Sequence, residues 1–231
     1  LTPSLKPSPA AFAAREALLA MALVARLRVL AREDRRLSGG RLMLMLAIFP
    51  ALFHLHFIGR RITGDAVYYY VYTRSMVRDA DVDFANEYEH YDLLKRGDFS
   101  MPTDTGHRRS IYSVGPGLLW TPFFLAADGL NSLLRGMGFE VNTSGYGPLH
   151  INAVALGSFA YGVLALFLIH AFLRRHFGDR LAGGAVLLLW WASFFEWYLV
   201  EQPLTSHPLS VLLVASFFLL RQNQALATAP G

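Results

Sequence analysis

The stretch INAVALGSFAYGVLALFLIHAFL occupies residues 151–173 and contains no charged side chain. It is followed by the basic segment RRHFGDR (174–180) and then by a second uncharged run, LAGGAVLLLWWASFF (181–195). A membrane-spanning helix needs about 20 mainly apolar residues. Two such runs on either side of a short basic segment predict a pair of spanning helices, over about 151–173 and 181–199, joined by a tight turn.

Two further runs, 42–59 and 207–220, have the same character. The chain as a whole is 54% hydrophobic and 16% charged, whereas an ordinary soluble domain is about 25% charged. The sequence therefore predicts an all-α integral membrane protein with about four spanning helices. It contains no cysteine, which excludes thiolate catalysis and cysteine-based metal sites.

Charge is segregated along the chain. Residues 1–41 hold eight Lys/Arg and three Asp/Glu, a net of +5, while residues 60–110 hold eight Lys/Arg and nine Asp/Glu, a net of −1. Lys and Arg are enriched in cytoplasmic segments of membrane proteins, so we expect residues 1–41 and the turn 174–180 to face the cytoplasm. The net charge of +4 is then a topology signal, and we expect no nucleic-acid partner.

This orientation makes residues 60–148 one large outer loop. Only an even number of crossings fits between the first span and residues 151–173, so we predict that Ile111–Leu134 is a re-entrant or membrane-surface element. Glycine and proline residues interrupt the apolar run at its start, which agrees with this interpretation.

Three segments complete the predicted organisation. Residues 1–40 read as a basic amphipathic helix on the anionic inner leaflet, the alternative being a disordered leader. Residues 41–221 form the membrane domain, and residues 222–231 read as a cytoplasmic loop cut short. Because the sequence does not begin with Met, we expect the chain to be a fragment of a longer protein.

The outer loop begins with GDAVYYYVYTRS (64–75). Asp65 follows the first predicted span, and its position has two interpretations. It can be the N-cap of the tyrosine-rich helix, or it can be a general base acting on a hydroxyl acceptor at the membrane boundary. Tyr68 and Tyr72 are four residues apart and share a helix face.

Other candidates lie further along. The acids Asp79, Asp81 and Asp83 resemble an oxygen-ligand cluster for a hard cation, but they lack the register of a calcium loop, and a solvated acidic turn is the favoured alternative. Arg108 and Arg109 could hold a phosphate or simply form a solvated basic loop.

The second outer loop is EWYLVEQPLTSHP (196–208). Carboxylates at the end of a span are candidates for function. We therefore expect Glu201 and His207 to meet the Asp65 region on the outer face.

Four blocks taken together resemble the bacterial membrane glycosyltransferases of the GT-C type, which include protein-mannosyltransferase-like and lipopolysaccharide-core galacturonosyltransferase-like proteins. The resemblance covers about residues 42–221. The blocks are GDAVYYY (64–70), DVDFANEY (81–88), YSVGPGLLWTPFF (112–124) and EQPLTSH (201–207).

The resemblance implies an enzyme of the bacterial inner membrane that transfers a sugar, with inversion, from a polyprenyl-phosphate carrier to a lipid, glycan or protein acceptor on the periplasmic side. It assigns Asp65 as catalytic base and Glu201 as the acid of the second loop. Family members are longer, so the chain would be the N-terminal part of such an enzyme.

The chemistry suggests further roles. Tyr69, Arg108, Arg109 and His207 are candidates for substrate binding, and a divalent metal on Asp65 and Glu201 is an alternative way to stabilise the phosphate leaving group. Two other functions are open, a transporter or flippase fragment and a non-catalytic membrane scaffold. A transporter would carry polar residues in the middle of its spans, whereas the acids here lie at outer ends.

Overall fold

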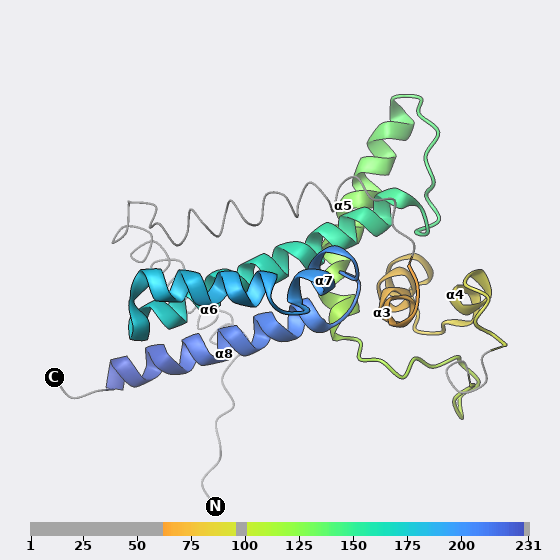
Figure 1. The fold of residues 1–231 in the computed structure, drawn as a ribbon. Coiled ribbons are helices and arrows are strands. Elements are labelled where there is room, and N and C mark those ends of the chain that lie inside the picture. The colour runs from red at the N-terminus through yellow and green to blue at the C-terminus, as the bar shows by residue number, and fades with distance from the viewer. Residues whose placement is uncertain (1–61, 96–100, 229–231) are drawn as a thin grey trace, which may run out of the picture.

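The computed structural model describes residues 62–95 and 101–228, which are mostly helical (Figure 1). The predicted first span, 42–59, and the basic segment 1–40 lie outside the described residues, as do 229–231. An isolated bridge between Pro102 and Arg108 is the one extended pairing among the residues described. The elements in chain order are α3 (Asp65–Arg74), the π-helical turn η1 (Ser75–Asp79), α4 (Ala85–His90), α5 (Gly115–Gly136), α6 (Pro148–Trp191), α7 (Phe195–Val200) and α8 (His207–Thr228).

Helix α6 is a helical hairpin. Its 44 residues are interrupted at Gly178, which has φ 74° and ψ 164°, a backbone conformation that glycine adopts without steric cost. The chain reverses there, and the two arms lie side by side (Figure 1). Phe159 of the first arm contacts Trp190 of the second, with ring centroids 6.4 Å apart. Gly178 lies within the segment 174–180 that the sequence marks as a turn.

The second arm is shorter than the predicted helix over 181–199. It ends at Trp191, and α7 begins only at Phe195. The Ser193 hydroxyl donates to the carbonyl of Leu189 and accepts the backbone N–H of Phe195 at 3.1 Å. A serine side chain that bonds to nearby backbone groups can compete with the helix, and these two bonds lie at the break between α6 and α7.

Helix α8 runs along the hairpin and continues to Thr228, past the predicted end at residue 220. Its far end is bound to the turn of α6, where Arg175 donates to the side chains of Gln222 at 3.0 Å and Asn223 at 2.6 Å. Residues 222–228 are helical rather than the loop that we predicted, and at the start of this range Gln222 and Asn223 have a partner on the neighbouring helix.

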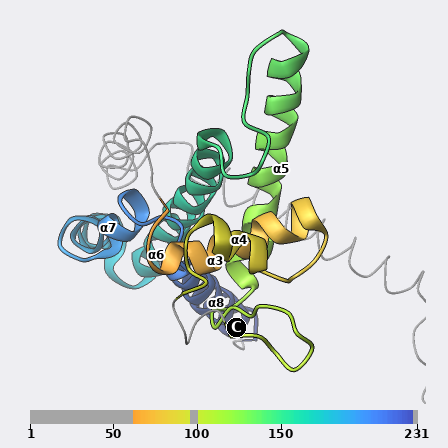
Figure 2. The same cartoon turned by 90° about the vertical axis from the view of Figure 1, so that its right-hand side faces the viewer.

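Helix α5 crosses the hairpin obliquely, and its C-terminal half projects beyond α6 and α8 (Figures 1 and 2). Pro116 is accommodated in the first turn and Pro122 within the helix. The predicted interruptions at these residues therefore do not break the helix. The crossing with α3 is close, because a Cβ on Gly117 would lie 2.5 Å from the Cβ of Tyr72.

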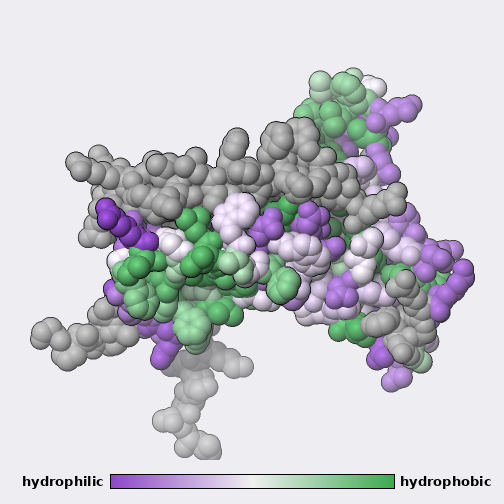
Figure 3. Space-filling view, viewed as in Figure 1, coloured by the Kyte–Doolittle hydropathy of each residue, from purple (hydrophilic) through white to green (hydrophobic). Residues whose placement is uncertain are grey.

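Two apolar clusters hold these elements together. The larger one joins α3, α4, α5, the start of α6 and Leu204 and Leu209 near the start of α8, while the smaller one joins the two arms of α6 with α7. Other large apolar side chains remain exposed, among them Leu188 on α6, Phe194 before α7 and Phe217 on α8. Figure 3 shows such groups gathered on the surface of the helices.

The described part of the chain contains one helix, Pro148–Trp191, that is long and apolar enough to cross a membrane, and 39% of its most apolar stretch is buried. The predicted helical class is therefore confirmed for these residues. The number of membrane crossings stays a prediction.

Candidate functional site

Asp65 is the first residue of α3, and its side chain is exposed. The N-cap position belongs to Gly64, whose φ of 60° turns the chain into the helix, and no side chain caps the helix. The interpretation of Asp65 as an N-cap is therefore wrong. Its negative charge in the first turn is favourable for the helix dipole, but its oxygens are not occupied by the backbone of the helix.

The segment 110–112 lies along one face of α3. Ser110 Oγ donates to the carbonyl of Tyr68 at 3.2 Å, and the hydroxyl of Tyr72 donates to the carbonyl of Tyr112 at 2.9 Å. The ring of Tyr112 stacks on that of Tyr68, with centroids 5.4 Å apart, and meets the ring of Tyr69 edge-on at 4.8 Å. Aromatic pairs in these geometries are favourable beyond their burial.

Asp65 belongs to the same face, because residues three and four apart on a helix are neighbours and Tyr68 and Tyr69 follow it at these spacings. Burial, followed by the effect of the neighbouring Asp65 carboxylate, raises the pKa of Tyr112 to about 12. The phenol therefore stays protonated near neutral pH.

The second outer loop reaches this face through Ser206. The hydroxyls of Tyr69 and Ser206 are hydrogen-bonded at 2.9 Å, and Leu204 is buried in the same cluster as Ala66 and Val67 of α3. The sequence predicted that the two loops meet, and the structure brings Tyr69 against the second loop.

Two titratable side chains of that loop, Glu201 and His207, were predicted to meet the Asp65 region. Glu201 is exposed and ends α7. His207 is exposed, and its ring packs on Tyr198 of the same loop with centroids 3.9 Å apart. The contact that joins the loop to α3 thus runs through Ser206, next to His207, and the roles of Glu201 and His207 stay predictions.

Arg108 and Arg109 are fixed through their backbones. The N–H of Arg108 donates to Asp83 Oδ1 at 2.8 Å, and the carbonyl of Arg109 accepts the hydroxyl of Tyr88 at 3.0 Å. These bonds hold the strand-like segment that leads directly to Tyr112. Phosphate binding by the two guanidinium groups stays a prediction.

The acids 79, 81 and 83 point to separate partners. Asp79 pairs with Arg74, Asp81 accepts the Ser75 hydroxyl at 2.7 Å, and the Arg108 N–H lowers the pKa of Asp83. Within 62–95 and 101–228, no group of three or more His, Asp or Glu side chains is arranged to hold a metal ion. The run is the acidic turn that was the favoured alternative. A metal on the Asp65 and Glu201 pair stays a prediction.

A buried charge network lies behind α3 and was not predicted from the sequence. Arg74 Nη1 donates to Glu87 Oε1 at 2.6 Å, its Nε donates to the Ser144 carbonyl at 3.2 Å, and the guanidinium lies 4.6 Å from the Tyr146 ring centroid. The Glu87 side chain has no solvent exposure, and its Oε2 is buried without a hydrogen-bond partner. Burial raises the pKa of Glu87 to about 7, against the opposing effect of Arg74.

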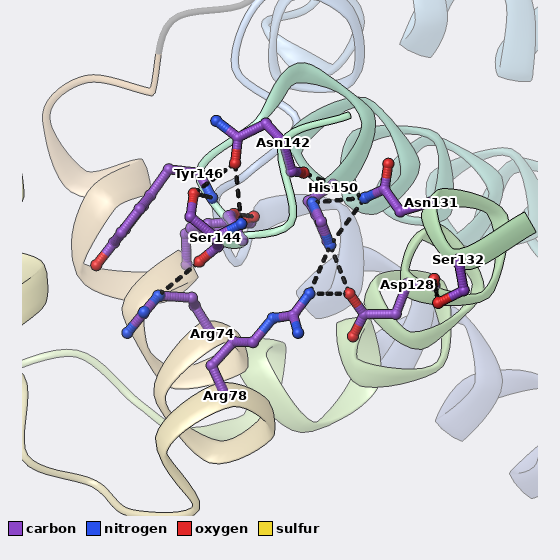
Figure 4. Close-up of polar contacts among 11 residues, drawn as sticks. Arg74, Arg78, Asp128, Asn131, Ser132, Asn142, Ser144, Tyr146 and His150 are labelled. Atoms are coloured by element: carbon purple, nitrogen blue, oxygen red, sulfur yellow. Dashed lines mark hydrogen bonds and ion pairs between the residues drawn. The ribbon is translucent and has the colours of Figure 1, made fainter. Parts of the chain in front are cut away.

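A second arginine, four residues later, ties three elements together (Figure 4). Asp128 Oδ1 of α5 pairs with Arg78 of η1 and with His150 Nε2 of α6 at 2.7 Å. His150 is fully buried, as is nearly all of Asn131, which lies beside it. The spacing of Arg74 and Arg78 was the available signal, since residues four apart share a helix face. Their partners lie too far along the chain to be paired with them from sequence.

These networks fix the orientation of α3 relative to α4, α5 and α6, and so fix the position from which Asp65 projects. The chain was compared with protein-family models, with curated proteins and with solved structures, and none matches.

Proposed function

We propose that the chain is part of a GT-C-type membrane glycosyltransferase, which transfers a sugar from a polyprenyl-phosphate carrier to an acceptor hydroxyl on the outer face of the bacterial inner membrane, with inversion. The observation that carries the proposal is the Asp65 site. An exposed carboxylate starts a tyrosine-rich helix, and the same face of that helix binds the second outer loop through Tyr69 and Ser206.

The membrane part of the proposal draws on α6 and α8. A straight helix of 44 residues would be about 66 Å long, roughly twice the thickness of a bilayer core. The reversal at Gly178 divides it into a first arm long enough to span the core and a second arm that ends at Trp191 and is only about 20 Å long, with α7 following at Phe195. We propose that the first arm, the second arm together with α7, and α8 cross the membrane, with the basic turn 174–180 on the cytoplasmic side.

We propose α5 as a membrane-surface element, because it crosses α6 and α8 instead of running along them (Figure 1). Its exposed apolar side chains include Leu125, Leu130 and Leu133. These can enter the outer leaflet while its opposite face packs on α3 and α6.

In the proposed reaction the acceptor hydroxyl oxygen attacks the anomeric carbon of the carrier-bound sugar. The bond from that carbon to the carrier phosphate oxygen breaks, and the polyprenyl phosphate leaves with the bonding electron pair. The acceptor proton passes to Asp65, the general base. A single displacement inverts the anomeric configuration.

The leaving phosphate needs positive charge beside it. We propose Arg108 and Arg109 for this role, because the segment that carries them continues into Tyr112 and so runs towards Asp65. Tyr69 and His207 border the same region and are proposed to contact the sugar or the acceptor. A divalent cation held by Asp65 and Glu201 is the alternative source of charge.

The test is Asp65→Asn in the full-length protein, assayed in membranes with a panel of labelled polyprenyl-phosphate sugars. A general base contributes roughly 100- to 10,000-fold to a rate, so transfer should fall by at least about 100-fold at unchanged expression. Asp104→Asn, which neutralises another exposed acid of the outer loop, is the matched control and should transfer normally. Unchanged transfer by Asp65→Asn would refute the proposal and favour the scaffold alternative.

A further inference from the structure

We propose that Asp83 is a positioning residue for Arg108 and Arg109. Its carboxylate holds the turn 102–108 against the start of α4 and so fixes the place from which the two arginines meet the leaving phosphate. This inference rests on the proposed function, which it deepens by naming the side chain that determines where the phosphate-binding charge lies.

Both oxygens of the Asp83 carboxylate have partners. Oδ1 accepts the backbone N–H of Arg108 at 2.8 Å and that of Ala85, the first residue of α4, at 3.3 Å. Oδ2 lies 3.2 Å from Nδ1 of His107. The Arg108 N–H is also the main cause that lowers the pKa of Asp83, so the carboxyl is ionised near neutral pH. Hydrogen bonds to an ionised acceptor are stronger than those between neutral groups, and these bonds tie α4 to two consecutive residues of the turn.

The turn that Asp83 holds is closed by its own hydrogen bonds. Pro102 and Arg108 form an antiparallel bridge, and the carbonyl of His107 accepts the backbone N–H of Thr103 at 2.8 Å and its hydroxyl at 3.1 Å. Gly106 has a φ of 86°, a conformation that favours glycine, and its N–H donates to the carbonyl of Thr103 at 2.9 Å. Because the turn is bonded to itself, a contact that fixes His107 and Arg108 fixes the rest of it.

Arg108 and Arg109 are also held through their carbonyls. The N–H of Phe84 donates to the carbonyl of Arg108 at 3.3 Å, and the hydroxyl of Tyr88 donates to that of Arg109 at 3.0 Å. The rings of Phe84 and Tyr88 are buried in the same apolar cluster as the core face of α3. The two arginines are therefore docked on the core that also supports the helix that begins with Asp65.

The contact with Asp83 uses the backbone N–H of Arg108 and not its guanidinium group. The carboxylate therefore determines where the arginines lie while Arg109 is exposed to a ligand. Positive charge that is already in place stabilises a leaving phosphate without the cost of reorganisation. Asp83 thus acts through the arginines and does not itself touch the phosphate.

The first test measures the affinity of the full-length protein in detergent for farnesyl phosphate, a short isoprenoid phosphate without a sugar. Loss of a hydrogen bond from a charged group weakens an affinity by about 10- to 100-fold, so we expect a loss of this size in Asp83→Ala. Asp83→Asn keeps one acceptor oxygen and should lie between Asp83→Ala and the wild type. Charge alone predicts the opposite, because removing an acid near a phosphate strengthens its binding.

Two controls accompany this test. Asp104→Ala removes an exposed acid from the same turn and should bind farnesyl phosphate at least as tightly as the wild type does. Farnesol has the same chain and no phosphate, so all the variants should bind it equally. Equal affinities of the wild type and Asp83→Ala for farnesyl phosphate, or no binding by either, overturn the inference. An equal loss of farnesol binding overturns it as well, because it would show a general loss of structure.

The second test asks whether Asp83 acts through the arginines. In a protein that carries Arg108→Gln and Arg109→Gln, Asp83→Ala should cause no further loss of affinity for farnesyl phosphate, and the farnesyl chain keeps that affinity measurable. Losses that multiply would show that Asp83 supports some other part of the protein, and the inference would fail.

The inference and the proposed function can fail separately. Normal transfer by Asp65→Asn refutes the transferase, whereas a selective loss of farnesyl phosphate binding in Asp83→Ala would still support the positioning of the arginines. Unchanged binding by Asp83→Ala refutes the positioning role, even where Asp65→Asn abolishes transfer.

Discussion

Replacing Glu87 by glutamine should remove a pH dependence from the stability of the protein. The Glu87 carboxyl is fully buried, and its pKa rises from 4.5 to about 7. The folded state therefore binds this proton more tightly than the unfolded state does. The contribution to stability is fully present below pH 4.5 and is lost as the pH rises through 7.

The size of the effect follows from the shift. Each pKa unit corresponds to about 1.4 kcal/mol, so ionising Glu87 in the folded protein costs about 3 kcal/mol of the free energy of unfolding between pH 4.5 and pH 7. Arg74 limits this cost but does not cancel it, because Oε2 of Glu87 has no hydrogen-bond partner. Glutamine keeps the size and the carbonyl acceptor of the side chain and cannot ionise.

The assay is denaturant unfolding in detergent at pH 5 and pH 8. The wild-type protein should lose about 2.5 kcal/mol more than Glu87→Gln between these two values. Glu89→Gln, an exposed acid on the same short helix, should behave as the wild type does, and the histidines are common to all three proteins. Equal pH dependence in wild type and Glu87→Gln would refute the reasoning.

Two further predictions concern packing and the contact between the outer loops. Gly117→Ala should cost about 1–3 kcal/mol of stability by overpacking the crossing of α3 and α5, because the added Cβ would lie 2.5 Å from that of Tyr72. The control Gly129→Ala should not destabilise the protein, because a Cβ there meets no atom within 4 Å. Equal unfolding midpoints for the two variants would contradict this prediction. Tyr69→Phe and Ser206→Ala should each lower the free energy of unfolding by about 1 kcal/mol, and a double-mutant cycle should give a coupling energy of similar size. A coupling energy of zero would mean that the two hydroxyls, 2.9 Å apart, do not interact.

The sequence predicted the helical class and the reversal after residue 173 because both depend on local composition. Runs of about 20 uncharged, mainly apolar residues are long enough for helices, and a glycine between arginines marks a turn. The break near Ser193 was not predictable in this way, because the apolar run continues through it. The extension of α8 beyond residue 220 was missed for a similar reason, because the partners of Gln222 and Asn223 lie on α6.

The candidate site was predictable to a similar extent. The position of Asp65 after an apolar run marks it for attention, and the idea that two outer loops meet there agrees with the contact between Tyr69 and Ser206. Tyr112 begins a block of aromatic and glycine residues that is typical of a membrane interface, and the sequence does not distinguish it from the other aromatic residues there. The network of Arg74, Glu87 and Tyr146 depends on folding alone, because its members come from separate segments of the outer loop.

The hydrogen bond between Tyr69 and Ser206 has a consequence for the order of synthesis, since its partners are 137 residues apart. At about 5–20 residues per second, a ribosome needs roughly 7 to 27 seconds to make the chain between them. During that interval the tyrosine face of α3 has already been made while the second loop does not yet exist. The contact between α3 and residues 201–207 is therefore assembled late, after both arms of α6 have been synthesised, and a chain interrupted within α6 would keep the contacts of Tyr69 with Tyr112 and Trp120 but lack the one with Ser206.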